Sequence, residues 1–127
     1  MAKRSILVTG SGGMLGQALT SCLESKGHSV RGMPREELDV TNFEQVNRLI
    51  KEAQPDLVIH PAAYTRVDQA ESEADLAFLI NGYGTENIAV TCNNLHIPMM
   101  YLSTDDVFDG VQDRPYQPWD DTRPISI

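Results

Sequence analysis

The sequence predicts an α/β fold, an open, doubly wound parallel sheet with helices on both faces. Three observations lead to this fold class. Short apolar or β-branched runs alternate with helix-like patterns, most runs are apolar at successive positions, and a glycine-rich turn joins the first run to the first helix. Strands that are apolar throughout are typical of parallel sheets covered on both faces. At 127 residues, the chain is predicted to form one domain, residues 1–127.

Four strands are expected from these runs. They are residues 5–8 (SILV), 28–31 (HSVR), 56–60 (DLVIH) and 99–103 (MMYLS). A proline precedes each of the last two runs and marks the end of the connecting segment. The fourth run is expected to be an outer strand with an open edge. Open edges pair readily with other chains, so self-association is expected.

Two helices are expected before the third strand. In the first, leucines recur every four residues from Leu15 until Gly27 ends the pattern. The second is expected to open at Thr41, with Glu44 three residues later in the spacing of a capping box.

A third helix is expected from near Ser72 and Asp75, another capping spacing, and its apolar stripe includes Gly84. A glycine inside such a stripe indicates close approach to another backbone or, alternatively, a break between two helices. Beyond Gly110, prolines punctuate a polar segment, so residues 111–127 are predicted to be mostly loop.

Charge and composition exclude several classes of partner. Ten basic against eighteen acidic residues give a net charge of −8, opposite to the basic surface that nucleic acids or anionic membranes require. No run is long enough to span a bilayer, and the first is too short for a signal peptide, so a cytoplasmic location is expected. Cys22 and Cys92 lie on apolar helical stripes and are expected to be buried free thiols. They show no metal-ligand spacing, and no metal is expected.

The strongest local signal is the turn after the first strand. In ILVTGSGGMLG, Gly10, Gly13 and Gly16 stand between a strand and the start of a helix. Glycines at this spacing permit a tight turn, close approach of the backbone to a pyrophosphate, and close packing of helix on strand. The helix N-terminus adds free N–H donors. In this context the pattern predicts dinucleotide binding.

The end of the second strand bears on which dinucleotide is bound. A carboxylate there would hold the ribose 2′-hydroxyl of NAD, whereas a guanidinium suits the 2′-phosphate of NADP. Arg35 occupies this tip and favours NADPH, while the two glutamates that follow it leave NADH open. Asp39 and Val40, further along, are expected beside the adenine.

Five ordered segments, TGSGGMLG, ELDVTN, HPAAYTRVDQAESE, NGYGTENIA and STDDVFDG, resemble the dTDP-4-dehydrorhamnose reductases of the extended short-chain dehydrogenase/reductase superfamily. The similarity runs from Ile6 to about Pro124. It implies a Rossmann-like NAD(P)-binding fold and NAD(P)H-dependent reduction of a 4-keto sugar nucleotide in dTDP-L-rhamnose synthesis. Related proteins of this fold are non-catalytic, so a dinucleotide-binding or regulatory module is the alternative.

The resemblance also implies roles for individual residues. The phosphate loop would be Gly10, Ser11, Gly12, Gly13, Met14, Leu15 and Gly16. The nicotinamide side would be lined by Ala62, Ala63 and Tyr64, with Asn81 bracing the site. Substrate contacts would come from Val67, Asp105 and Asp106. The Thr104 hydroxyl, with Ser103 as second choice, would hydrogen-bond the substrate carbonyl.

Three features depart from the family's pattern. His60-Pro61 stands where the family more often has Asn-Ala, and His60 is expected to be a partly buried structural histidine. Asp106 replaces the usual tyrosine and adds negative charge near an anionic substrate. No tyrosine is followed four residues later by lysine, although the family's Tyr-x-x-x-Lys pair donates the proton in ketone reduction. The chain is therefore expected to be the cofactor-binding portion of an enzyme, truncated before that pair and inactive alone.

Overall fold

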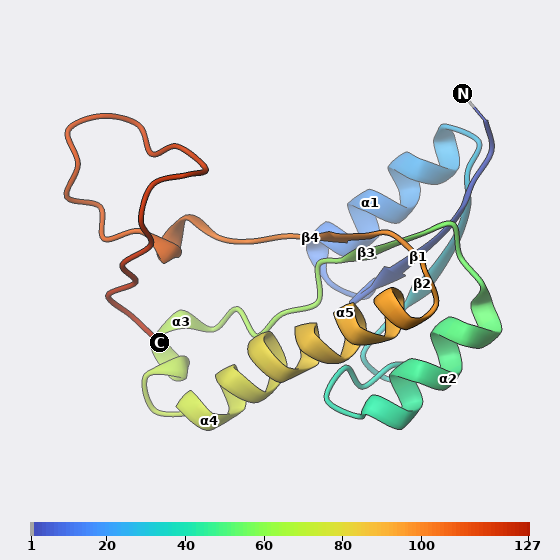
Figure 1. Ribbon diagram of the computed structural model, residues 1–127, viewed down its shortest axis with the longest axis horizontal. Coiled ribbons are helices and arrows are strands. Elements are labelled where there is room, and N and C mark those ends of the chain that lie inside the picture. The colour runs from blue at the N-terminus through green and yellow to red at the C-terminus, as the bar shows by residue number, and fades with distance from the viewer. Residues whose placement is uncertain (1) are drawn as a thin grey trace.

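Four parallel strands form one sheet in the order β2-β1-β3-β4 (Figure 1). The computed structural model describes residues 2–127. The strands are β1 (Ser5–Thr9), β2 (Ser29–Met33), β3 (Leu57–His60) and β4 (Met99–Tyr101). The chain builds outward from β1 to β2 and then crosses to the other side of β1, which places helices on both faces. The predicted open, doubly wound parallel sheet is confirmed.

Helix α1 (Met14–Ser25) covers one face of the sheet, and helices α2 (Phe43–Ala53) and α5 (Gly84–Asn94) cover the other (Figure 1). Successive strand residues point to opposite faces, so the core has two parts. The part beside α1 contains Ile6, Val8 and Ile59. The part beside α2 and α5 contains Leu7, Met33, Leu38, Val40, Val46, Ile50, Val58, Ile88 and Cys92. Because both faces are buried, the central strands are apolar at successive positions.

Helix α2 begins later than the sequence spacing predicts. Its N-cap is Asn42, whose Oδ1 accepts a hydrogen bond from the backbone N–H of Gln45 at 3.0 Å. The Thr41 hydroxyl instead donates to Asp39 Oδ1 at 2.7 Å. The predicted Thr41–Glu44 capping box is therefore wrong, because asparagine caps at least as well as threonine and Thr41 already has a partner.

The third predicted helix is continuous but changes pitch. Helix α4 (Ala74–Ala77) passes into a π-helical segment, Phe78–Tyr83, and then into α5. Glu73 is the N-cap and makes no side-chain capping bond, so the predicted Ser72–Asp75 capping pair is wrong. The Ser72 hydroxyl donates to a backbone carbonyl of the preceding turn instead.

Gly84, at the start of α5, allows a close approach between segments. A Cβ at this position would lie 2.7 Å from Cγ2 of Val40. The Val40 carbonyl also accepts a hydrogen bond from Asn87 Nδ2 at 2.9 Å. The close approach predicted for this glycine is therefore to the Val40 side chain rather than to another backbone, and the helix does not break.

The two cysteines differ in burial. Cys92 is buried in the core, as predicted, and burial raises the pKa of its thiol to about 11. Cys22 is exposed, so its predicted burial is wrong. Helix α1 packs on the sheet through Leu19 and Leu23. Cys22 lies about 100° around the helix from Leu23, on the solvent side.

The chain after β4 leaves the sheet (Figure 1). It forms one 3₁₀ turn, Asp105–Val107, and residues 108–127 have neither helix nor strand. Arg114 and Asp120 form a bidentate ion pair at 2.8 and 2.9 Å within this segment, and the guanidinium lowers the pKa of Asp120. These contacts give the loop segment a defined course.

The last residues return to a short helix, α3 (Val67–Ala70), which the sequence analysis did not predict. The Ile127 backbone N–H donates a hydrogen bond to the Glu71 carboxylate at 3.1 Å.

Among the helices of residues 2–127, none has both the length and the apolar character to cross a membrane.

Candidate functional site

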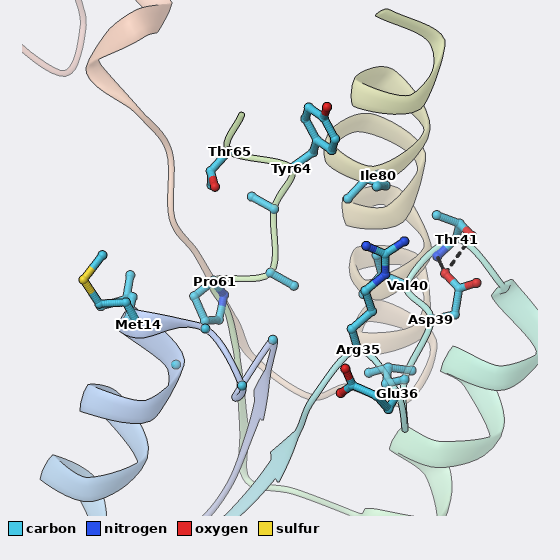
Figure 2. A pocket seen from close by; sticks show the side chains of 18 of the residues that line it. Met14, Arg35, Glu36, Asp39, Val40, Thr41, Pro61, Tyr64, Thr65 and Ile80 are labelled. Carbon is cyan, nitrogen blue, oxygen red and sulfur yellow. Dashed lines mark hydrogen bonds between the residues drawn. The ribbon is translucent and has the colours of Figure 1, made fainter. Parts of the chain in front are cut away.

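A cleft of about 560 Å³ lies at the carboxyl ends of β1, β2 and β3. The loops that follow these strands form most of its wall, and helix α4 with the π-helical segment completes it (Figure 2). Most residues predicted to bind the cofactor line this cleft: Gly10, Gly12, Gly13, Met14, Leu15, Gly16, Arg35, Asp39, Val40, Ala62, Ala63 and Tyr64. Open parallel α/β sheets bind their ligands at this end.

The loop after β1 has no space for side chains at two positions. Gly10 has a φ of +56°, and a Cβ there would lie 2.8 Å from Ala62 Cα. A Cβ on Gly16 would collide with the Gly10 carbonyl oxygen and lie 2.7 Å from Ser11 Cα. Glycine at both positions therefore lets the loop contact the β3 loop on one side and α1 on the other.

The N-terminus of α1 contributes unpaired donors to the cleft. Its N-cap, Gly13, makes no side-chain capping bond, and the first turn of α1 contains no acidic residue. The first residue, Met14, lines the cleft and is 91% exposed. Free N–H groups and the positive end of the helix dipole make this end of α1 suitable for a phosphate group.

Ser11 ties the glycine loop to β2. Its backbone N–H donates to the Met33 carbonyl at 3.3 Å. Its side chain packs over Gly32, where a Cβ would lie 2.8 Å from Ser11 Cβ. The predicted phosphate-loop residue Ser11 therefore supports the loop from outside the cleft lining.

The loop after β2 brings a cation to the cleft. Arg35 extends along the wall toward Ile80, and the Glu36 carboxylate lies at the lower end of the same wall in this view (Figure 2). The ion pairs found among residues 2–127 involve other arginines. Asp39 also lines the cleft, but its Oδ1 accepts hydrogen bonds from the N–H and hydroxyl of Thr41. The Arg35 guanidinium is therefore available for an anion.

Asn81 fixes the loop after β3. Its Oδ1 accepts a hydrogen bond from the Tyr64 N–H at 2.7 Å, and its Nδ2 donates to the Tyr64 carbonyl at 3.0 Å. The Tyr64 hydroxyl donates to the Glu73 carboxylate at 2.5 Å, and this bond raises the pKa of Tyr64. Asn81 thus acts on the cleft through the Tyr64 backbone.

His60, the last residue of β3, is fully buried rather than partly buried. Its Nδ1 lies 2.7 Å from Thr9 Oγ1, and its Nε2 lies 3.2 Å from Thr85 Oγ1. Burial lowers the pKa of His60 to about 4, so the ring is neutral at pH 7. No group of three or more His, Cys, Asp or Glu side chains in residues 2–127 is arranged to hold a metal ion.

The predicted catalytic and substrate-binding side chains lie outside the cleft lining. Ser103 and Thr104 follow β4 and are exposed. Thr104 Oγ1 accepts a hydrogen bond from the Asp106 N–H at 3.2 Å and lies 3.4 and 3.3 Å from the carboxylates of Asp105 and Asp106. The hydroxyl thereby caps the 3₁₀ turn. Val67, at the start of α3, is half exposed.

The apolar residues of the helical wall of the cleft were not assigned to it by sequence reasoning. Leu76, Leu79 and Ile80 come from α4 and the π-helical segment and line the cleft. The sequence pattern placed Leu76 and Ile80 only in the apolar stripe of the third predicted helix. Leu79 and Ile80 lie in the π-helical segment, whose pitch differs from that of an α-helix, and no simple residue pattern marks such a segment in advance.

Comparison with known proteins identifies the family. A family model described as "RmlD substrate binding domain" matches residues 4–127. The chain belongs to this family. It is 40% identical over 128 residues to the dTDP-4-dehydrorhamnose reductase of Mycolicibacterium smegmatis, covering 100% of this chain and 38% of that protein. It is 38% identical over 120 residues to the dTDP-4-keto-6-deoxy-D-glucose reductase of Streptomyces niveus, covering 94% of this chain and 42% of that protein.

A solved structure of an RmlD relative has the same fold. The dTDP-4-dehydrorhamnose reductase from Bacillus anthracis, in complex with NADP, matches with a TM-score of 0.94 and 37% identity, over 99% of this chain and 45% of that one. The resemblance read from five sequence segments is therefore confirmed. The chain spans about two fifths of the length of the curated relatives it matches.

Proposed function

We propose that the chain is the NADPH-binding portion of a dTDP-4-dehydrorhamnose reductase, with NADH as the weaker ligand. The cleft carries this proposal, because the glycine loop, the N-terminus of α1 and Arg35 all line one space. The similarity to the NADP-bound reductase of Bacillus anthracis supports it. A 4-keto sugar nucleotide as substrate and a cytoplasmic location are proposed from the same family membership.

The residues of the cleft fit a dinucleotide. Gly10 and Gly16 let the glycine loop pack tightly against the β3 loop and α1, and the backbone of this loop lines the cleft, where it can approach a pyrophosphate closely. The volume lies within the range of small-molecule pockets, roughly 300–1,000 Å³. Arg35 would hold a 2′-phosphate through charge-assisted hydrogen bonds. The guanidinium favours NADPH, while the Glu36 carboxylate, which lines the same cleft, leaves NADH as the weaker ligand.

The remaining side chains would orient the reacting groups. The bound cofactor would supply the hydride for ketone reduction. Ala62 and Ala63 would lie against its nicotinamide end, and Asn81 would keep the adjoining Tyr64 backbone in place. Thr104 would hydrogen-bond the substrate carbonyl. Its single hydroxyl proton can serve one acceptor, so it must turn away from the neighbouring carboxylates to do so.

A non-catalytic dinucleotide-binding module is the second candidate. The observation that favours it is the position of Thr104, whose hydroxyl caps the 3₁₀ turn outside the cleft lining. Both candidates predict dinucleotide binding, and they differ in whether the protein that contains this chain reduces a sugar nucleotide.

Calorimetric titration of the chain with NADPH and NADH tests the proposal. We expect tighter binding of NADPH, and Arg35→Ala should weaken NADPH binding by about 10- to 100-fold, the loss of one charged hydrogen bond, with little effect on NADH. Arg48→Ala is the control, because Arg48 lies on α2 and pairs with Glu52 at 3.7 Å. Equal or tighter binding of NADH by the unmodified chain would refute the assignment of NADPH.

A further inference from the structure

Three strand ends and one helix meet at the buried ring of His60. Thr9 ends β1, His60 ends β3 and Tyr101 ends β4, while Thr85 lies in the first turn of α5. The two ring nitrogens contact the hydroxyls of Thr9 and Thr85. The ring also stacks on Tyr101, with centroids 6.1 Å apart and planes at 27°. One side chain therefore connects three neighbouring strands to α5.

These contacts lie immediately before the loops that form the cleft. Thr9 precedes Gly10 and His60 precedes Pro61, and both Gly10 and Pro61 line the cleft. The two loops touch, because a Cβ on Gly10 would lie 2.8 Å from Ala62 Cα. A displacement of the His60 ring would therefore move two walls of the cleft relative to each other.

The third contact extends this connection to the segment after β4. Tyr101 pairs with His60 in the parallel register of β3 and β4. The chain continues from Tyr101 through Leu102 to Ser103 and Thr104. The stacked ring pair thus relates the position of the proposed carbonyl-binding hydroxyl to the end of β3.

We propose that His60 is a positioning residue that aligns the β3 loop and the segment after β4 with the glycine loop. Imidazole suits this role because its two nitrogens reach partners on opposite sides of the ring. A shorter amide side chain could keep the contact made by Nδ1 but would not reach the partner of Nε2. The effect on NADPH binding rests on the proposed function, whereas the effect on loop geometry does not.

The test uses variants that remove one contact at a time. Thr9→Val and Thr85→Val each remove a hydroxyl with little change in shape. Thr91→Val is the matched control, because Thr91 is buried on α5 and its hydroxyl has no hydrogen-bond partner among the described residues. At His60 itself, His60→Leu removes both hydrogen bonds, and His60→Asn returns a polar group at the place of Nδ1.

Three quantities are measured for each variant of the chain. They are the backbone amide chemical shifts of Gly10, Ala62 and Ser103 without ligand, the dissociation constant for NADPH, and the thermal midpoint. We expect Thr9→Val and His60→Leu to shift the Gly10 and Ala62 amides and to weaken NADPH binding by about fivefold, the equivalent of one net hydrogen bond. His60→Leu should also shift the Ser103 amide.

His60→Asn should recover part of the Gly10 shift and of the affinity relative to His60→Leu, and Thr91→Val should change neither. The proposal is overturned if the thermal midpoints fall while the loop amides and the affinity match those of Thr91→Val, since His60 would then be a structural residue only. If His60→Leu does not fold, Thr85→Val decides through the same readouts at a half-buried position. If the unmodified chain does not bind NADPH, the proposed function fails, and the ligand-free shifts still decide the role of His60.

Discussion

Two glycines on one continuous helix should respond in opposite ways to the same substitution. Gly82 lies in the π-helical segment, where an added Cβ meets nothing within 4 Å. Gly84 lies two residues later, where an added Cβ would be 2.7 Å from Cγ2 and 3.3 Å from Cβ of Val40. Val40 cannot easily yield, because it is buried and its carbonyl is bonded to Asn87.

The difference between the two variants isolates the steric contact. Alanine is favoured over glycine inside a helix by about 0.5–1 kcal/mol, and this gain is common to both variants. Overpacking at a rigid contact costs about 1–3 kcal/mol. We therefore expect Gly82→Ala to raise the free energy of unfolding by about 0.5–1 kcal/mol. The free energy of unfolding of Gly84→Ala should be about 1–3 kcal/mol lower than that of Gly82→Ala.

Urea unfolding of the two variants and the unmodified chain measures this difference, provided that the slopes agree. Gly84→Ala should also weaken NADPH binding, because Val40 lines the cleft and must shift. If Gly84→Ala is as stable as Gly82→Ala, the close contact between α5 and Val40 is not a constraint on the fold and the reasoning fails.

Three further predictions concern pH, assembly and turnover. Because the pKa of His60 is lowered to about 4 in the folded chain, the unfolded chain binds a proton on His60 at a higher pH than the folded chain does. The stability that the neutral ring provides is therefore full above about pH 6.5 and is lost as the pH falls toward 4, a change of up to about 3 kcal/mol in the free energy of unfolding. Urea unfolding at pH 7 and pH 4.5 measures this change, and His60→Asn should remove it. The open edge of β4, where Met100 and Tyr101 are about half exposed, should support self-association of the chain. Met100→Lys should reduce the apparent mass in light scattering. A chain that stays monomeric at every concentration would contradict the prediction. Residues 1–127 alone should not oxidise NADPH in the presence of dTDP-4-keto-rhamnose, because Thr104 can orient a carbonyl but no tyrosine in the chain has a lysine four residues on; measurable absorbance loss at 340 nm would show that another acid acts.

Apolar runs in the sequence predicted the sheet well, whereas capping spacings predicted the first residues of the helices poorly. The central strands β1 and β3 were predictable because a parallel sheet covered on both faces needs apolar residues at successive positions, whereas the edge strands β2 and β4 are less buried. The N-cap of α2 is Asn42 rather than Thr41 because either of these adjacent residues can cap a helix, and the contact of Thr41 with Asp39 decides between them. That contact depends on the folded loop, which the sequence does not display.

In the candidate site, too, some features could be predicted from the sequence and others could not. The glycine loop was predictable because backbone φ and the lack of a Cβ are properties of glycine itself, as at Gly10 and Gly16. The role of Asn81 was assigned only by resemblance, and the structure shows its side-chain amide hydrogen-bonded to the Tyr64 backbone. Leu79 lines the cleft from the π-helical segment, and such segments have no simple sequence pattern.

Two of the three departures expected from the family's pattern lie at neighbouring strand ends. His60 and Pro61 end β3, Asp106 follows β4, and these two strands are neighbours in the sheet. The loops after β1 and β2, which carry the glycines and Arg35, keep the features expected of an NADPH site. His60 stacks on Tyr101, so a change at the end of β3 bears directly on the segment that leads to Thr104. We therefore expect this chain to differ from its relatives in how it presents a substrate to the cofactor more than in how it binds the cofactor.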